Sequence, residues 1–198
     1  MQKSARRIYG IKINYRLMND FLSNTDEMRA AQKRGDVSEQ FEKRIMLAVT
    51  QVNGCRLCSY YHTKEALKMG MPDDEIKSLL SGDLAVTPEE EAVALAFAQH
   101  YAETIGYYDP DAWQRLVQTY GEPRSRSILV YIRAIMMGNA QGNIAGALRS
   151  RFRGQPEPAS SFFKEIGVLL LDPFFIMFIL IKAPFARLLK VRKTQKGS

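Results

Sequence analysis

The sequence predicts an all-α protein. Apolar residues recur at helical spacing along most of the chain, whereas the period-two alternation typical of strands is nearly absent. Gly and Pro pairs divide this pattern into segments of ordinary helix length. The 198 residues, 46% hydrophobic and 25% charged, are enough to bury one core, so we expect one domain with additional segments.

Three helices are expected in the first seventy residues. The first covers residues 8–31 and ends before Gly35-Asp36, where the pattern breaks. Ser38 is the expected N-cap of the second helix, which ends at Asn53-Gly54. A third helix begins at about Cys55 and ends near Gly70.

Proline near the first turn is the expected start signal of the next four helices. Proline is tolerated there because the first helical N–H groups have no partner within the helix. The expected helices are a short one over Glu75–Leu80 after Pro72-Asp73, one from Thr87-Pro88 to about Ile105 with Thr87 at the cap, one from Asp109-Pro110 to about Tyr120, and a long one from Glu122-Pro123 to about Arg151.

The C-terminal part of the chain differs in composition. Residues 154–158 are expected to be a linker, which divides the chain into a helical domain over 1–156 and a tail over 157–198. The segment Ile166–Ile181 is almost entirely apolar but only 16 residues, about 24 Å as a helix, and Asp172-Pro173 is expected to open a new helix within it. A simple membrane span of about 20 residues is therefore not expected.

Two environments suit this tail. It can lie on an anionic membrane surface through Phe174–Lys193, or it can pack on a neighbouring subunit. The net charge is +7, with a sequence pI of about 9.4, and much of the excess lies at the chain ends. The terminal basic residues are Lys3, Arg6, Arg7, Lys182, Arg187, Lys190, Arg192, Lys193 and Lys196. No nucleic-acid-binding signature accompanies them, so nucleic acid is not an expected partner.

The chain has two cysteines, and they are three residues apart. A disulfide-stapled secreted fold would have more, and the first residues do not resemble a secretory signal. We therefore expect a cytoplasmic protein, or one attached to the inner face of the membrane.

These cysteines belong to a Cys-x-x-Cys-x-x-x-His pattern, Cys55, Cys58 and His62. At a helix start the two thiols can close a small disulfide, and the unpaired N–H groups stabilise a thiolate. His62, four residues after Cys58, is expected on the same face as a base or charge partner. We expect Cys58 to attack an oxidised substrate and Cys55 to resolve the product.

Two other interpretations of the pattern exist. The cysteines can be chance apolar packing. They can also be ligands of zinc together with His62, but structural zinc needs four ligands, and the other histidine, His100, has no ligand cluster near it. No metal or cofactor is therefore expected, and redox chemistry is favoured. Tyr60 and Tyr61 are expected to be core or interface aromatics.

The stretch from Leu47 to His62 resembles the core motif of the alkylhydroperoxidase D-like branch of the carboxymuconolactone decarboxylase superfamily. The closing stretch of that branch, N…R-x-x-G-x-P, is similar to the segment from Asn139 through Arg151 and Gly154 to Pro156. The resemblance covers about residues 8–156. It implies a helical bundle that often forms homo-oligomers. The decarboxylases of the superfamily as a rule lack the paired cysteines.

The resemblance also implies an activity. Members of this branch reduce hydroperoxides with the dithiol, and a partner dithiol protein returns the electrons. In the best-studied members a Glu precedes the first Cys by twelve residues, and here that position is Lys43. Glu42 and Glu39 are the nearby candidates for the missing carboxylate. A His that those members carry between the cysteines is Leu57 here.

Two functions follow. The first is a thiol-dependent peroxidase that cycles between dithiol and disulfide at Cys55 and Cys58. The alternative is a non-catalytic, oligomeric redox sensor or adaptor whose tail binds a membrane or a partner. The complete Cys-x-x-Cys-x-x-x-His pattern favours the enzyme, whereas the substituted relay positions favour the sensor.

Overall fold

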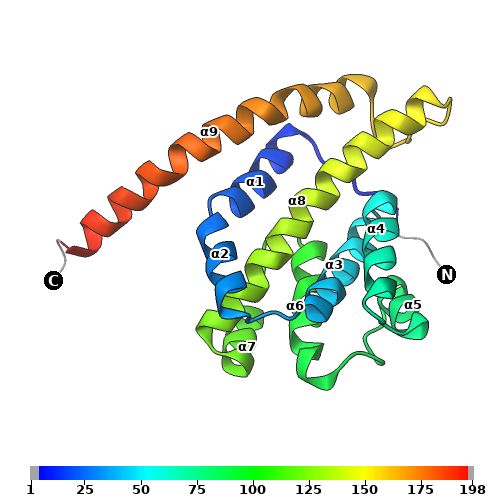
Figure 1. The fold of residues 1–198 in the computed structure, drawn as a ribbon. Helices are drawn as coiled ribbons and strands as arrows, with labels where there is room; N and C mark the ends of the chain where they lie inside the picture. The colour runs from blue at the N-terminus through cyan, green and yellow to red at the C-terminus, as the bar shows by residue number, and fades with distance from the viewer. Residues whose placement is uncertain (1–4, 196–198) are drawn as a thin grey trace.

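A computed structural model describes residues 5–195 of the chain, with side chains described for residues 5–183. Within this part there are nine helices and no strand, which confirms the predicted all-α class (Figure 1). The helices are α1 (Ile11–Leu22), α2 (Thr25–Arg34), α3 (Glu39–Asn53), α4 (Arg56–Lys68), α5 (Asp73–Ser81), α6 (Glu89–Glu103), α7 (Pro110–Tyr120), α8 (Glu122–Phe152) and α9 (Phe162–Gln195).

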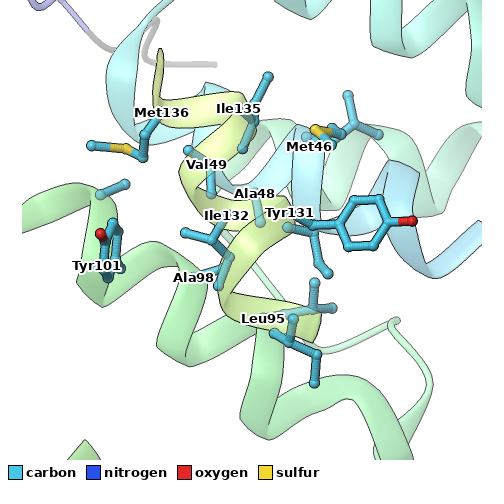
Figure 2. Packing of buried hydrophobic residues seen from close by; sticks show 14 of the residues in the cluster. Met46, Ala48, Val49, Leu95, Ala98, Tyr101, Tyr131, Ile132, Ile135 and Met136 are labelled. Carbon is cyan, nitrogen blue, oxygen red and sulfur yellow. The ribbon is translucent and has the colours of Figure 1, made fainter. Parts of the chain in front are cut away.

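Helix α8 is the centre of the bundle. It is 31 residues long and packs against α1, α2, α3, α4, α6, α7 and α9. The core lies where α3, α6 and α8 meet, and Figure 2 shows apolar side chains from all three helices filling this space. The labelled ones include Val49 of α3, Leu95 of α6 and Ile132 of α8. Helix α4, which carries Cys58 and His62, packs against this central helix.

Several helix ends follow the predicted local chemistry. The Ser38 hydroxyl accepts a hydrogen bond from the Phe41 N–H at 3.2 Å, as an N-cap of α3 should. Asp109 caps α7 in the same way, and Pro110 occupies the first position. The start of α6 differs, because Pro88 itself is the N-cap. The Thr87 hydroxyl instead donates to the Leu84 carbonyl at 2.7 Å, so the prediction of Thr87 as the cap was wrong.

The predicted helix over residues 8–31 is two helices, α1 and α2. Asn24 adopts a non-helical conformation between them, with φ −116° and ψ 21°. Its side-chain N–H donates to the Asp20 carbonyl at 2.8 Å. Asn competes for backbone groups in this way, which apolar periodicity does not reveal.

The C-terminal tail also differs from the prediction. Asp172-Pro173 does not open a new helix, because α9 runs through it without a break. Pro173 lacks an N–H, but Val168 before it and Ile179 after it are both buried, so packing outweighs the local cost. As a result, Phe162–Ala183 forms a 22-residue apolar segment, long and apolar enough to cross a membrane by length and composition alone. The prediction that the apolar stretch was too short was therefore wrong.

Candidate dithiol redox site

The two cysteines are positioned by the turn between α3 and α4. Gly54 ends α3 in the left-handed conformation, with φ 63°, and its N–H donates to the Thr50 carbonyl at 2.9 Å. This turn makes Cys55 the N-cap of α4. Cys58 then lies one turn into the helix, on the side of Cys55.

The two sulfur atoms form a disulfide, with an S–S distance of 2.18 Å. The Cys58 N–H donates to Sγ of Cys55 at 3.3 Å, so the Cys55 sulfur lies where α4 stabilises negative charge. Cys55 is 1% exposed, whereas Cys58 is only partly buried. An attacking molecule can therefore reach Cys58 more easily than Cys55.

Helix α8 forms the wall behind the disulfide. A Cβ atom at Gly142 would lie 2.7 Å from Sγ of Cys55 and 2.9 Å from Sγ of Cys58. One turn earlier, the Gly138 carbonyl oxygen lies 3.8 Å from Sγ of Cys58. Gly142 was not predicted as a site residue, although Gly138, Gly142 and Gly146 recur every four residues, a spacing that places them on one face.

Buried amides hold the start of α4 in place. The Asn143 side chain donates to the Asn53 carbonyl at 2.8 Å and to the Arg7 carbonyl at 3.0 Å. The Tyr9 hydroxyl donates to Oδ1 of Asn53 at 3.0 Å. On the same side of α8, the Thr50 hydroxyl donates to Oδ1 of Asn139 at 3.1 Å. These contacts join the N-terminal segment, α3 and α8 around the turn that carries Cys55.

His62 lies one turn beyond Cys58 on α4, in a basic setting. Its pKa is lowered to about 4, chiefly by burial and also by the positive charge of Lys43, whose effect is larger than the opposite effect of Glu65. Its Nδ1 atom is buried with no hydrogen-bond partner among the described residues. The imidazole is therefore neutral at pH 7, and it can exchange hydrogen bonds but cannot easily hold a second proton.

Neither predicted carboxylate is a main influence on His62. Glu42 pairs with Nζ of Lys43 at 3.1 Å, and it raises the pKa of Tyr131, which burial raises more strongly. Glu39 is exposed at the first position of α3. The structure thus brings the two cysteines together, with His62 on the same helix. Lys43, which the sequence indicated only as a substituted Glu position, is the positive charge that lowers the pKa of His62.

The remaining candidates have other roles. Among the described residues no three His, Cys, Asp or Glu side chains are grouped to hold a metal ion. Nε2 of His100 accepts a hydrogen bond from the Asp109 N–H at 3.3 Å, at the start of α7. Tyr60 and Tyr61 are exposed, so they are not core residues. With Leu57 they form an exposed apolar surface on α4 beside Cys58.

The sequence was compared with known families and proteins. The carboxymuconolactone decarboxylase family matches residues 19–100, a segment that contains the turn, both cysteines and His62. The chain is also similar to the uncharacterized protein YdfG of Bacillus subtilis (strain 168), with 28% identity over 128 residues, which cover 61% of this chain and 86% of that protein. No solved structure matches the chain.

Proposed function

We propose that this protein is a thiol-dependent oxidoreductase of the alkylhydroperoxidase D-like kind, which reduces hydroperoxides through Cys55 and Cys58. The observation that carries the proposal is the pair of sulfurs at bonding distance at the N-terminus of α4. Cys58 is partly buried, whereas Cys55 is fully buried, and α8 lies against both sulfurs. Such an arrangement suits a centre that is oxidised and reduced repeatedly.

In the oxidative half-reaction the Cys58 thiolate attacks the outer oxygen of a hydroperoxide. The O–O bond breaks, the alcohol leaves after taking up one proton, and Cys58 becomes a sulfenic acid. The Cys55 sulfur then attacks Sγ of Cys58 and displaces water, which forms the disulfide. The hydroperoxide gains two electrons, and the two thiols lose them.

In the reductive half-reaction a dithiol protein supplies two electrons. Its thiolate attacks Cys58, because Cys55 is covered. The S–S bond breaks and Cys55 leaves as a thiolate. The Cys58 N–H and the N-terminus of α4 stabilise this anion, which makes Cys55 the better leaving group. The second thiol of the reductant then releases Cys58 and completes the exchange.

The surroundings of His62 limit the proton transfer. A neutral imidazole beside Lys43 is a weak base, so thiolate formation depends more on the helix N-terminus than on His62. Lys43 occupies the position at which the best-studied members of this branch have Glu. We therefore expect slow turnover compared with an enzyme that has a carboxylate there.

The test follows consumption of cumene hydroperoxide by the purified protein with dithiothreitol. Cys58→Ser should abolish turnover and should give no sulfenic acid adduct with dimedone. Cys55→Ser is the matched control, since it should form the Cys58 dimedone adduct once but not cycle. Turnover that persists in Cys58→Ser, or an adduct on Cys55 in place of Cys58, would contradict the assignment of roles.

A second candidate function is a redox sensor or adaptor whose dithiol is oxidised once and then recognised by a partner. The positive charge of Lys43 beside His62 favours it, because the proton relay lacks its carboxylate. In the same assay, a disulfide that forms once and is not reduced again by excess dithiothreitol, so that one equivalent of hydroperoxide is consumed per chain, would support the sensor. Many equivalents would support the enzyme.

A further inference from the structure

Helix α9 is attached to the bundle along one side only. Glu165 is fully buried and accepts two hydrogen bonds from Arg151 of α8, both at 2.9 Å. Asp172 is buried and faces Gln141 of α8. The ring of Phe175 packs on Tyr15 of α1, with centroids 5.0 Å apart. These contacts fix which face of α9 is turned to the solvent.

The opposite side of α9 carries a strip of large apolar side chains. At 100° per residue, its members lie on the side opposite Glu165 and Asp172. Each is between 55% and 85% exposed. The apolar strip consists of Phe163, Leu170, Phe174, Met177, Phe178 and Ile181. It extends about 27 Å along the helix, on the side where a helix of a water-soluble protein normally has polar residues.

The charged residues that follow Asp172 in the sequence are all positive. After Asp172 the sequence contains six Lys and Arg residues and no Asp or Glu. Lys182 is exposed at the end of the strip. The other five, which include Arg187, Lys190, Arg192 and Lys193, lie outside the residues whose side chains are described. An apolar surface beside a run of positive charge complements an anionic lipid surface.

From these observations we infer that the apolar strip of α9 binds an anionic lipid bilayer, with the helix parallel to the membrane plane. A specific protein partner would be expected to exchange hydrogen bonds across the interface, but no polar side chain belongs to the strip. A membrane span would expose Glu165 and Asp172 to hydrocarbon and separate Glu165 from Arg151. Lipid binding through one side keeps both contacts with α8.

This orientation also determines where the dithiol faces. Arg151 is nine residues from Gly142, which corresponds to opposite sides of α8. In Figure 1 α8 accordingly runs between α9 and α4. A bilayer on the strip therefore leaves Cys58 accessible from the aqueous phase. The inference does not depend on the proposed function, because a protein with an inert dithiol would bind lipid in the same way.

The experiment measures flotation of the full-length protein with vesicles of phosphatidylcholine and phosphatidylglycerol at 3:1. The test variant replaces Phe163, Phe174 and Phe178 with Gln, and the matched control replaces the exposed Val86 and Val93 with Gln. The test variant should lose at least about tenfold in vesicle partitioning, and the control should not. Partitioning of the wild type onto phosphatidylcholine alone should be about tenfold weaker. Equal partitioning of both variants would overturn the inference.

Further measurements test two alternatives, a second chain that covers the apolar strip and a helix α9 that spans the membrane. Sedimentation of the wild type without lipid reports whether a second chain covers the strip, and a dimer dissociated by the three Phe→Gln changes, with no vesicle binding, would overturn the inference. Resistance of the bound protein to alkaline carbonate would indicate a span and would overturn the parallel orientation. Unchanged reduction of the disulfide by a water-soluble phosphine on vesicles would support that orientation. A slowing of more than about tenfold would overturn it.

Discussion

Helix α8 contacts α4 on one side and α9 on the other, and the two contacts are built in opposite ways. Toward α4 it presents Gly142, where the absence of a side chain lets two sulfur atoms approach the backbone. Toward α9 it presents Arg151, which donates two hydrogen bonds to the buried Glu165, and Gln141, which faces the buried Asp172. The first contact is tight because the two sulfur atoms occupy the space that a side chain at position 142 would need. The second leaves the far side of α9 free and apolar.

The two sides also respond to pH in opposite directions. Burial lowers the pKa of His62 to about 4 and raises the pKa of Asp172 to about 6. As the pH falls from about 6.5 to 4, His62 is protonated in the unfolded chain but stays neutral in the folded chain. His62 on the dithiol side therefore lowers the free energy of unfolding in this range. As the pH falls from about 6 to 4, Asp172 is protonated in the folded chain but still ionised in the unfolded chain. Asp172 on the α9 side therefore raises the free energy of unfolding in this range.

The largest expected effect is on the α9 side. Arg151→Met leaves the fully buried Glu165 without its cation, and we expect a loss of about 3 kcal/mol in the free energy of unfolding at pH 7. Arg151 holds the pKa of Glu165 below its usual value, so the difference from wild type should shrink as the pH falls below about 4.5. Urea denaturation at several pH values measures it. The exposed Arg149→Met is the control, and equal stability of the two variants would contradict the comparison.

The next effect is on the dithiol side. Gly142→Ala places a methyl group within 3 Å of both sulfurs, and we expect a loss of about 2 kcal/mol in the stability of the oxidised protein. Gly138→Ala has nothing within 4 Å of its Cβ and should stabilise the helix by up to about 1 kcal/mol. Thermal unfolding of the oxidised proteins measures the stability of both variants, and equilibration with dithiothreitol measures how readily their disulfides are reduced. An oxidised Gly142→Ala as stable as Gly138→Ala would show that α8 does not press on the disulfide.

A smaller effect concerns the charge around His62. Lys43→Glu removes a cation and adds an anion, so the pKa of His62 should rise from about 4 by about one unit or more. Burial, which is the larger cause, keeps it below the ordinary value. Proton NMR titration measures the change, with the exposed Lys33→Glu as control. If the peroxidase proposal is right, Lys43→Glu also raises turnover, and an unchanged pKa would remove Lys43 from the account of the site.

The smallest effect is at Asp172. Asp172→Asn removes a buried group that must ionise above pH 6, and we expect about 1 kcal/mol of added stability at pH 8. At pH 4 the two proteins should be equally stable, since the wild-type carboxyl is then protonated. Denaturation curves at these two pH values measure the difference. A constant difference at both values would mean that ionisation is not its cause.

Most of the fold could be predicted from the sequence, because helix starts and stops are local. Ser38, Asp109 and Gly54 cap their helices as expected, since each acts on backbone groups within one turn. The prediction was wrong at Asn24 and at Asp172-Pro173. Asn24 ends a helix through its own side chain, whereas Pro173 continues one because flanking residues are buried against other helices.

The reactive residues of the site could also be predicted from the sequence, but their surroundings could not. The spacing of Cys55, Cys58 and His62 is a local property of one helix, so the sequence determined which residues could react. Only the tertiary structure decided which sulfur is covered, that Lys43 is the charge near His62, and that Gly142 makes room for the disulfide. Those facts depend on how α3 and α8 lie against α4, and distances between helices are determined by packing across the whole bundle rather than by spacing along the chain.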